Sequence, residues 1–91
     1  MKKLSINITG RVQGVGFRYC TKILADESGI CGGVWNCDDG SVSVEAIGDN
    51  EKMAIFLERL KKSPSRFAKV VQMQIQANPE IKEIDKFEIR N

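Results

Sequence analysis

The chain has 91 residues, a mass of 10.2 kDa and a net charge of +2 from 14 basic and 12 acidic residues. This length builds one hydrophobic core, so we expect a single domain over residues 1–91. With 42% hydrophobic and 29% charged residues, the composition excludes a disordered tail, a collagen-like repeat and a membrane protein. The charge is too small to indicate binding to nucleic acid. No apolar run of signal-peptide type follows Lys2 and Lys3, which predicts a cytoplasmic protein.

Histidine is absent, and the three cysteines form no Cys-x-x-Cys pair. The commonest general base and zinc ligand is therefore missing, and no metal site is predicted. An odd number of cysteines fits a reducing compartment, so we expect Cys20, Cys31 and Cys37 to be free thiols. The alternative is a redox role for one of them, with Cys20 the first choice because it lies near the motif described below.

Residues Leu4–Thr9 alternate apolar and polar side chains, which predicts a half-buried strand. Three glycines in Gly10–Gly16 then predict a loop. A helical pattern starts at Phe17 and ends before Gly29, a typical C-terminal cap. The apolar positions of this helix are Phe17, Cys20, Ile23 and Leu24.

The pattern in the middle of the chain predicts a β-hairpin followed by a second helix. Ile30–Asn36 and Ser41–Ile47 are predicted strands, and Gly40 supplies the left-handed position of the turn between them. Asp49 or Asn50 is expected to cap the helix. Its core-facing stripe is Met53, Phe56, Leu57 and Leu60, and Lys61 and Lys62 close it.

Two further strands complete the prediction. Val71–Gln76 alternates apolar residues with glutamines, and Phe87–Ile89 forms a short last strand after a loop. The order of elements is strand, helix, strand, strand, helix, strand, with a short fifth strand. This is the α+β, ferredoxin-like split β-α-β arrangement, with both helices expected on one face of a mostly antiparallel sheet.

The loop Gly10–Gly16 and the first turn of the following helix form the candidate functional site of the sequence. Glycines let successive main-chain N–H groups gather around one anion, and the positive end of the helix points to the same place. Arg18 adds a planar fork for two oxygens of an anion. From the residues alone, two readings stay open: a pocket for one phosphate-sized group, or a tight connection with a solvated Arg18.

The run Gly10–Arg18 closely resembles the first signature of the acylphosphatase family. The family's second signature resembles Gly32–Asn36, which is followed at the matching intervals by Gly40, Val42 and Gly48. Phe87–Ile89 also resembles the end of family members. The resemblance covers essentially the whole chain, and two motifs at the correct mutual spacing are more specific than either alone.

The resemblance implies an enzyme that hydrolyses acyl phosphates, small molecules with a carboxyl-phosphate bond, to a carboxylate and inorganic phosphate. It implies catalytic roles for Arg18, which would bind the phosphoryl oxygens, and for Asn36, which would orient the attacking water. The residues implied in substrate binding are Gln13, Gly14, Val15, Gly16, Phe17 and Arg18, chiefly through their main-chain N–H groups. No cofactor, metal, membrane or nucleic acid is implied. Inorganic phosphate would be product and inhibitor, and the enzyme would be a monomer.

Two positions depart from the family pattern. Gly33 stands where an aromatic residue is usual, and Trp35 where a basic residue is usual. Both are expected on the open face of the sheet, opposite to Val34 and Asn36. Trp35 either replaces the missing aromatic residue on the same face or marks a tolerant position, and the sequence leaves both open.

Two other functions compete with the enzyme. One is a non-catalytic module that binds an anion or a partner, as in the acylphosphatase-like domains of hydrogenase-maturation carbamoyltransferases. The other is RNA binding, because the same topology occurs in RNA-recognition domains. Those domains stack bases on aromatic residues of the central strands, and Leu4–Thr9 and Ser41–Ile47 contain none. The enzyme is favoured over RNA binding for this reason, and over the non-catalytic module because Arg18 and Asn36 are both present.

Overall fold

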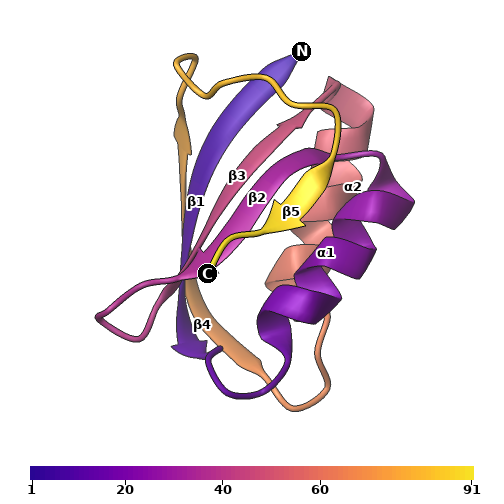
Figure 1. The fold of residues 1–91 in the computed structure, drawn as a ribbon. Coiled ribbons are helices and arrows are strands. Elements are labelled where there is room, and N and C mark those ends of the chain that lie inside the picture. The colour runs from indigo at the N-terminus through magenta and orange to yellow at the C-terminus, as the bar shows by residue number, and fades with distance from the viewer.

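The computed structural model describes all 91 residues as a five-stranded sheet with two helices on one face (Figure 1). The elements are β1 (Lys2–Arg11), α1 (Phe17–Ser28), β2 (Cys31–Asn36), β3 (Val42–Gly48), α2 (Asn50–Lys61), β4 (Lys69–Ala77) and β5 (Phe87–Ile89). The strand order is β4-β1-β3-β2-β5, and every neighbouring pair is antiparallel except β2 and β5. The α+β, ferredoxin-like prediction is confirmed.

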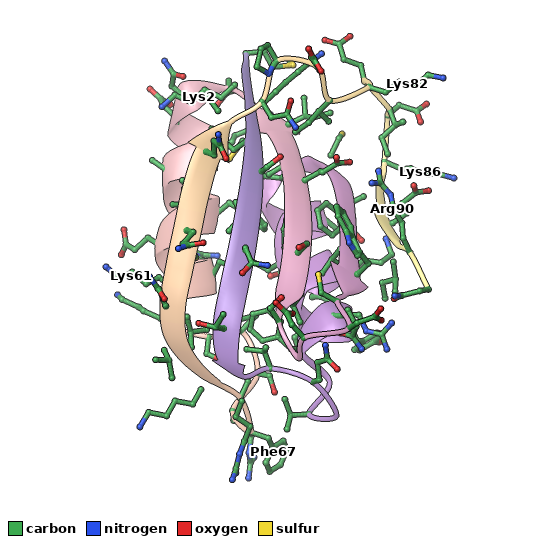
Figure 2. All side chains as sticks on the ribbon, turned by 90° about the vertical axis from the view of Figure 1, so that its left-hand side faces the viewer. Lys2, Lys61, Phe67, Lys82, Lys86 and Arg90 are labelled. Atoms are coloured by element: carbon green, nitrogen blue, oxygen red, sulfur yellow. The ribbon has the colours of Figure 1, made fainter.

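The two faces of the sheet differ as the alternation in the sequence predicts. Ile6 pairs with Val44 across β1 and β3, and both are almost fully buried beneath the helices. The next pair, Asn7 and Ser43, lies on the opposite face, where their side chains hydrogen-bond to each other at 3.2 Å. Figure 2 looks onto this open face, with the helices behind the sheet. The core therefore lies between the sheet and the helix layer.

Helix α1 begins after Gly16 and ends before Gly29, as expected, but its buried face is rotated. The buried residues are Phe17, Thr21, Leu24 and Ala25. The prediction was wrong for Ile23, which is 41% exposed. Thr21 can enter the core because its hydroxyl donates to the Phe17 carbonyl at 2.8 Å, which satisfies the polar group inside the helix.

Helix α2 follows the prediction closely. Asp49 is the cap residue, and its carboxylate accepts a hydrogen bond from the main-chain N–H of Lys52 at 2.8 Å. Met53, Phe56 and Leu60 are buried. Each helix has 12 residues, and neither has both the length and the apolar character needed to cross a lipid bilayer.

β1 and its neighbour β4, which lies at the edge of the sheet, are both longer than predicted. The register between β1 and β4 shifts after Thr9, so that Gly10 pairs with Val70 and Arg11 with Lys69. This β-bulge lets β1 continue for two residues beyond the predicted end at Thr9. It therefore carries Arg11 to the start of the glycine-rich loop.

The three cysteines are free thiols, as predicted. Each is partly buried, and the Cys37 sulfur lies 3.1 Å from the Ser43 hydroxyl. No disulfide therefore contributes to the stability of this fold.

Candidate active site

The glycine-rich loop joins β1 to α1 at the lower end of the molecule in Figure 1. A hollow of about 250 Å³ lies beside it. Gly14, Gly16, Arg18, Asn36 and Asn91 are among the residues that line the hollow. The structure thus brings Arg18 together with Asn36, which ends β2.

The main-chain N–H groups of residues 13–18 are the most unusual feature of this site. None of them donates a hydrogen bond to any group of the chain. Gly14 and Gly16 have φ values of +75° and +76°, a left-handed conformation that glycine adopts without strain. A loop of unpaired donors at the start of a helix is a typical anion-binding site.

Two side chains hold this loop from opposite sides. The Gln13 amide nitrogen donates to the carbonyls of Cys37 and Ser41, both at 2.8 Å. The Ser65 hydroxyl donates to the carbonyl of Val15 at 2.8 Å. The sequence assigned Gln13 to substrate binding, and the structure gives its side chain a bracing contact. Ser65 was missed, because nothing in the sequence connects it with the loop.

The hairpin that anchors Gln13 is itself well ordered by hydrogen bonds. One oxygen of Asp39 accepts bonds from the Ser41 main-chain N–H at 2.9 Å and from the Ser41 hydroxyl at 2.6 Å. These bonds hold the pKa of Asp39 below its usual value. Asn7 also donates to the Ser41 hydroxyl, at 3.0 Å. Gly40 has a φ of +91°, so the predicted turn is confirmed.

Asn91 links Arg18 to the end of β2. The Arg18 Nη1 donates to the side-chain oxygen of Asn91 at 2.9 Å and to its main-chain oxygen. The Asn91 carboxamide also pairs with the main chain of Asn36, accepting from its N–H at 3.3 Å and donating to its carbonyl at 3.1 Å. No bond within the chain uses the Nε or Nη2 of Arg18, so these donors remain for a ligand.

The Asn36 carboxamide makes no side-chain hydrogen bond with the protein. Its oxygen is buried and has no hydrogen-bond partner. An unpaired buried polar atom costs free energy, about 1–3 kcal/mol in typical proteins. The amide nitrogen also has no protein partner, and because Asn36 lines the hollow, this nitrogen is the group that can donate to a molecule bound there.

The departures at Gly33 and Trp35 lie away from this hollow. Trp35 lines a wider depression of about 670 Å³ over the open face of the sheet, which includes no residue of the loop. The Arg90 guanidinium lies 5.5 Å from the centre of the Trp35 ring. A Cβ atom at Gly33 would come within 2.5 Å of the Arg90 side chain. Arg90 therefore fills the space that a side chain at position 33 would need.

No group of three or more His, Cys, Asp or Glu side chains in the structure could hold a metal ion. The residues that line the hollow provide main-chain N–H groups, one guanidinium, two carboxamides and the hydroxyl of Tyr19 as donors. This set favours an oxyanion as the bound species.

The family model described as Acylphosphatase matches residues 4–89. A curated Acylphosphatase of Enterococcus faecalis is 47% identical over 89 residues, which cover 98% of each chain. The crystal structure of acylphosphatase from Bacillus subtilis superposes with a TM-score of 0.94 at 35% identity, over 100% of both chains. Full-length HypF in its phosphate- and nucleotide-bound form superposes with a TM-score of 0.90 at 29% identity. That match covers 99% of this chain but 12% of HypF.

Proposed function

Because this chain belongs to the acylphosphatase family and is a hydrolase that acts on acyl phosphates, we propose that the hollow between Arg18 and Asn36 is its active site. Hydrolysis there breaks the carboxyl-phosphate bond and releases a carboxylate and inorganic phosphate. The free main-chain N–H groups of residues 13–18 are the observation that carries this assignment.

The phosphoryl group binds to the loop. The N–H groups of Gln13, Gly14, Val15, Gly16, Phe17 and Arg18 donate to its oxygens. The Nε and Nη2 of Arg18 add charged donors, and Asn91 holds the guanidinium in place through Nη1. In phosphoryl transfer, negative charge spreads over the equatorial oxygens, so fixed donors around them lower the barrier.

Asn36 orients the attacking water. Asn36 lines the same hollow as Arg18 and its amide nitrogen has no protein partner, so this nitrogen can donate to a water held in line with the leaving group. An uncharged amide does this without repelling the phosphate. The leaving carboxylate is a weak base, because carboxylic acids have pKa values near 4. The leaving group therefore needs no general acid such as histidine, and we infer that the reaction uses no metal, cofactor or covalent intermediate.

The same site explains the expected behaviour of the product. Inorganic phosphate matches the loop as well as the phosphoryl group does, so it acts as a competitive inhibitor.

We further propose a single domain over residues 1–91, a monomer in the cytoplasm, and a small-molecule substrate without nucleic acid or membrane partners. The even mixture of charges, 14 basic and 12 acidic, supports the absence of a nucleic-acid partner.

Turnover of benzoyl phosphate tests the assignment. Arg18→Ala should abolish measurable hydrolysis, and Arg18→Lys should restore little of it, since lysine lacks the planar fork. Asn36→Ala should lower kcat by about 10² or more with little change in KM. Arg59→Ala is the matched control, because Arg59 is an exposed arginine near the end of α2 and makes no ion pair.

Undiminished rates in both the Arg18 and Asn36 variants would refute the assignment. Binding of inorganic phosphate by a wild-type protein that shows no hydrolysis would favour the non-catalytic module instead.

A further inference from the structure

We propose that a second hollow, on the other side of the phosphate loop, receives the acyl group of the substrate and favours acyl groups with a second negative charge. This inference rests on the proposed function, because the loop must hold the phosphate end. The hollow measures about 650 Å³ and is lined by Arg11, Arg66 and Phe67 together with loop residues 14–16.

The two hollows meet at the loop. Gly14 and Gly16 line both of them. A Cβ atom placed on either glycine would have no other atom within 4 Å, so the space above them is open. A molecule whose phosphate lies on the loop N–H groups can therefore extend over these glycines toward Arg11 and Arg66.

The second hollow carries positive charge that the protein does not neutralise. Neither Arg11 nor Arg66 forms an ion pair, and no acidic residue lines the hollow. Arg90 shows the contrast, because Glu45 and Glu88 pair with it at 2.6 and 2.8 Å. Two unpaired guanidinium groups at one hollow are suited to a carboxylate or a phosphate, which an arginine binds with two parallel hydrogen bonds.

Phe67 provides an apolar surface in the same hollow. Its side chain is 63% exposed, and the Arg66 guanidinium lies 5.0 Å from the centre of its ring. Figure 2 shows Phe67 at the lower end of the molecule, directed away from the sheet. The carbon atoms of an acyl group can pack on this ring while the charged end meets the arginines.

The segment that carries Arg66 and Phe67 is tied to the phosphate loop. The buried Ser65 donates to the Val15 carbonyl at 2.8 Å and also accepts from the N–H of Phe67 at 3.3 Å. The backbone that carries Arg66 is therefore held close to the loop, and the backbone of Arg11 is held by its pairing with Lys69 in the sheet. This arrangement selects acyl phosphates of dicarboxylic or phosphorylated acids over uncharged acyl groups of the same length.

The test compares substrates that differ only in the far end of the acyl group. Succinyl phosphate and butyryl phosphate both have a four-carbon acyl group, and succinyl phosphate has a carboxylate in place of the terminal methyl group. Wild-type protein should show a higher kcat/KM for succinyl phosphate, by roughly 1.5- to 5-fold per arginine, the range of exposed ion pairs. In Arg11→Gln/Arg66→Gln the ratio of the two kcat/KM values should fall to about 1. A third substrate, 3-phosphonopropanoyl phosphate, shows which anion is preferred.

Lys2→Gln/Lys82→Gln is the matched control. It removes the same net charge from the opposite end of the molecule (Figure 2), so it should leave the ratio unchanged. Dissociation constants of succinyl phosphonate and butyryl phosphonate, which are not hydrolysed at a carboxyl-phosphate bond, give the same ratio without turnover. A failure of hydrolysis is thereby separated from a failure of the acyl hollow.

The proposal is overturned if wild-type protein shows no preference for either charged acyl group. It is also overturned if the preference survives in Arg11→Gln/Arg66→Gln or falls equally in the lysine control. Hydrolysis of butyryl phosphate together with any of these results would leave the proposed active site standing and remove only the acyl hollow.

Discussion

Replacing Gln13 by alanine tests whether the phosphate loop is braced by the hairpin. The substitution removes two hydrogen bonds of 2.8 Å, to the carbonyls of Cys37 and Ser41. Both carbonyls keep a main-chain partner, from the N–H of Gly40 at 3.1 Å and of Cys37 at 2.9 Å, so neither becomes an unpaired acceptor. With about 0.5–1.5 kcal/mol for each of the two bonds, the free energy of unfolding should fall by about 1–3 kcal/mol.

That loss corresponds to a decrease in Tm of roughly 4–24 °C for a domain of this size. The loop should also become less well ordered, which lowers its affinity for phosphate. We expect the inhibition constant of inorganic phosphate against benzoyl phosphate hydrolysis to rise about tenfold, since small displacements at a preorganised site cost up to ~10². Thermal unfolding followed by circular dichroism and steady-state inhibition measure the two effects.

Gln72→Ala is the control, because Gln72 lies exposed on the open face in β4 and its amide makes no hydrogen bond. It should change Tm and phosphate inhibition little. The reasoning fails if Gln13→Ala melts within about 2 °C of wild type and binds phosphate equally well. A lower Tm with unchanged inhibition would show that the brace supports the fold but not the loop.

Three further predictions follow from the same geometry. Ser65→Ala removes the bond to the Val15 carbonyl and should raise the KM for benzoyl phosphate several-fold, while Ser65→Thr, which keeps a hydroxyl, should restore part of it. Gly16→Ala should lower the free energy of unfolding by about 1–2 kcal/mol in urea titrations, because its φ of +76° strains any residue with a Cβ atom although no neighbouring atom would clash. The hydrogen bonds from Ser41 lower the pKa of Asp39 below 3.8, so they stabilise the fold above that pH and this contribution is lost as the pH falls through the lower, folded-state pKa. Asp39→Ala should therefore be less stable than wild type at neutral pH, and a difference that stays constant down to strongly acidic pH would contradict this account.

The fold was predictable because its signals are local. Alternation in β1 and β3, the Asp49 cap and the terminal Gly29 each depend on a few neighbouring residues. The exception is the buried face of α1. There Thr21 is buried and Ile23 is not, because the Thr21 hydroxyl finds its hydrogen-bond partner within its own helix and can be buried without losing that bond. A pattern that counts only apolar residues misses such a position.

The site was predictable only in part. The paired motifs identified Arg18 and Asn36, and the structure places both at one hollow. Ser65 and Asn91 lie 50 and 73 residues away from the loop residues that they contact, Val15 and Arg18. A serine and an asparagine in irregular segments carry no periodic signal, so their contacts follow from tertiary packing alone.

The composition of the proposed site also determines where substrate choice can arise. The phosphate end is formed mainly by main-chain N–H groups of residues 13–18, and these donors are the same whatever side chains the loop carries. Such a loop recognises every phosphoryl group equally, and uniform recognition of this kind cannot distinguish one acyl phosphate from another. Discrimination must then come from side chains at the rim. Of these, Arg11 and Arg66 carry charge that no ion pair in the protein neutralises. In the proposed arrangement, the main-chain donors, Arg18 and Asn36 carry out the reaction in the catalytic hollow, and Arg11 and Arg66 select the substrate in the acyl hollow.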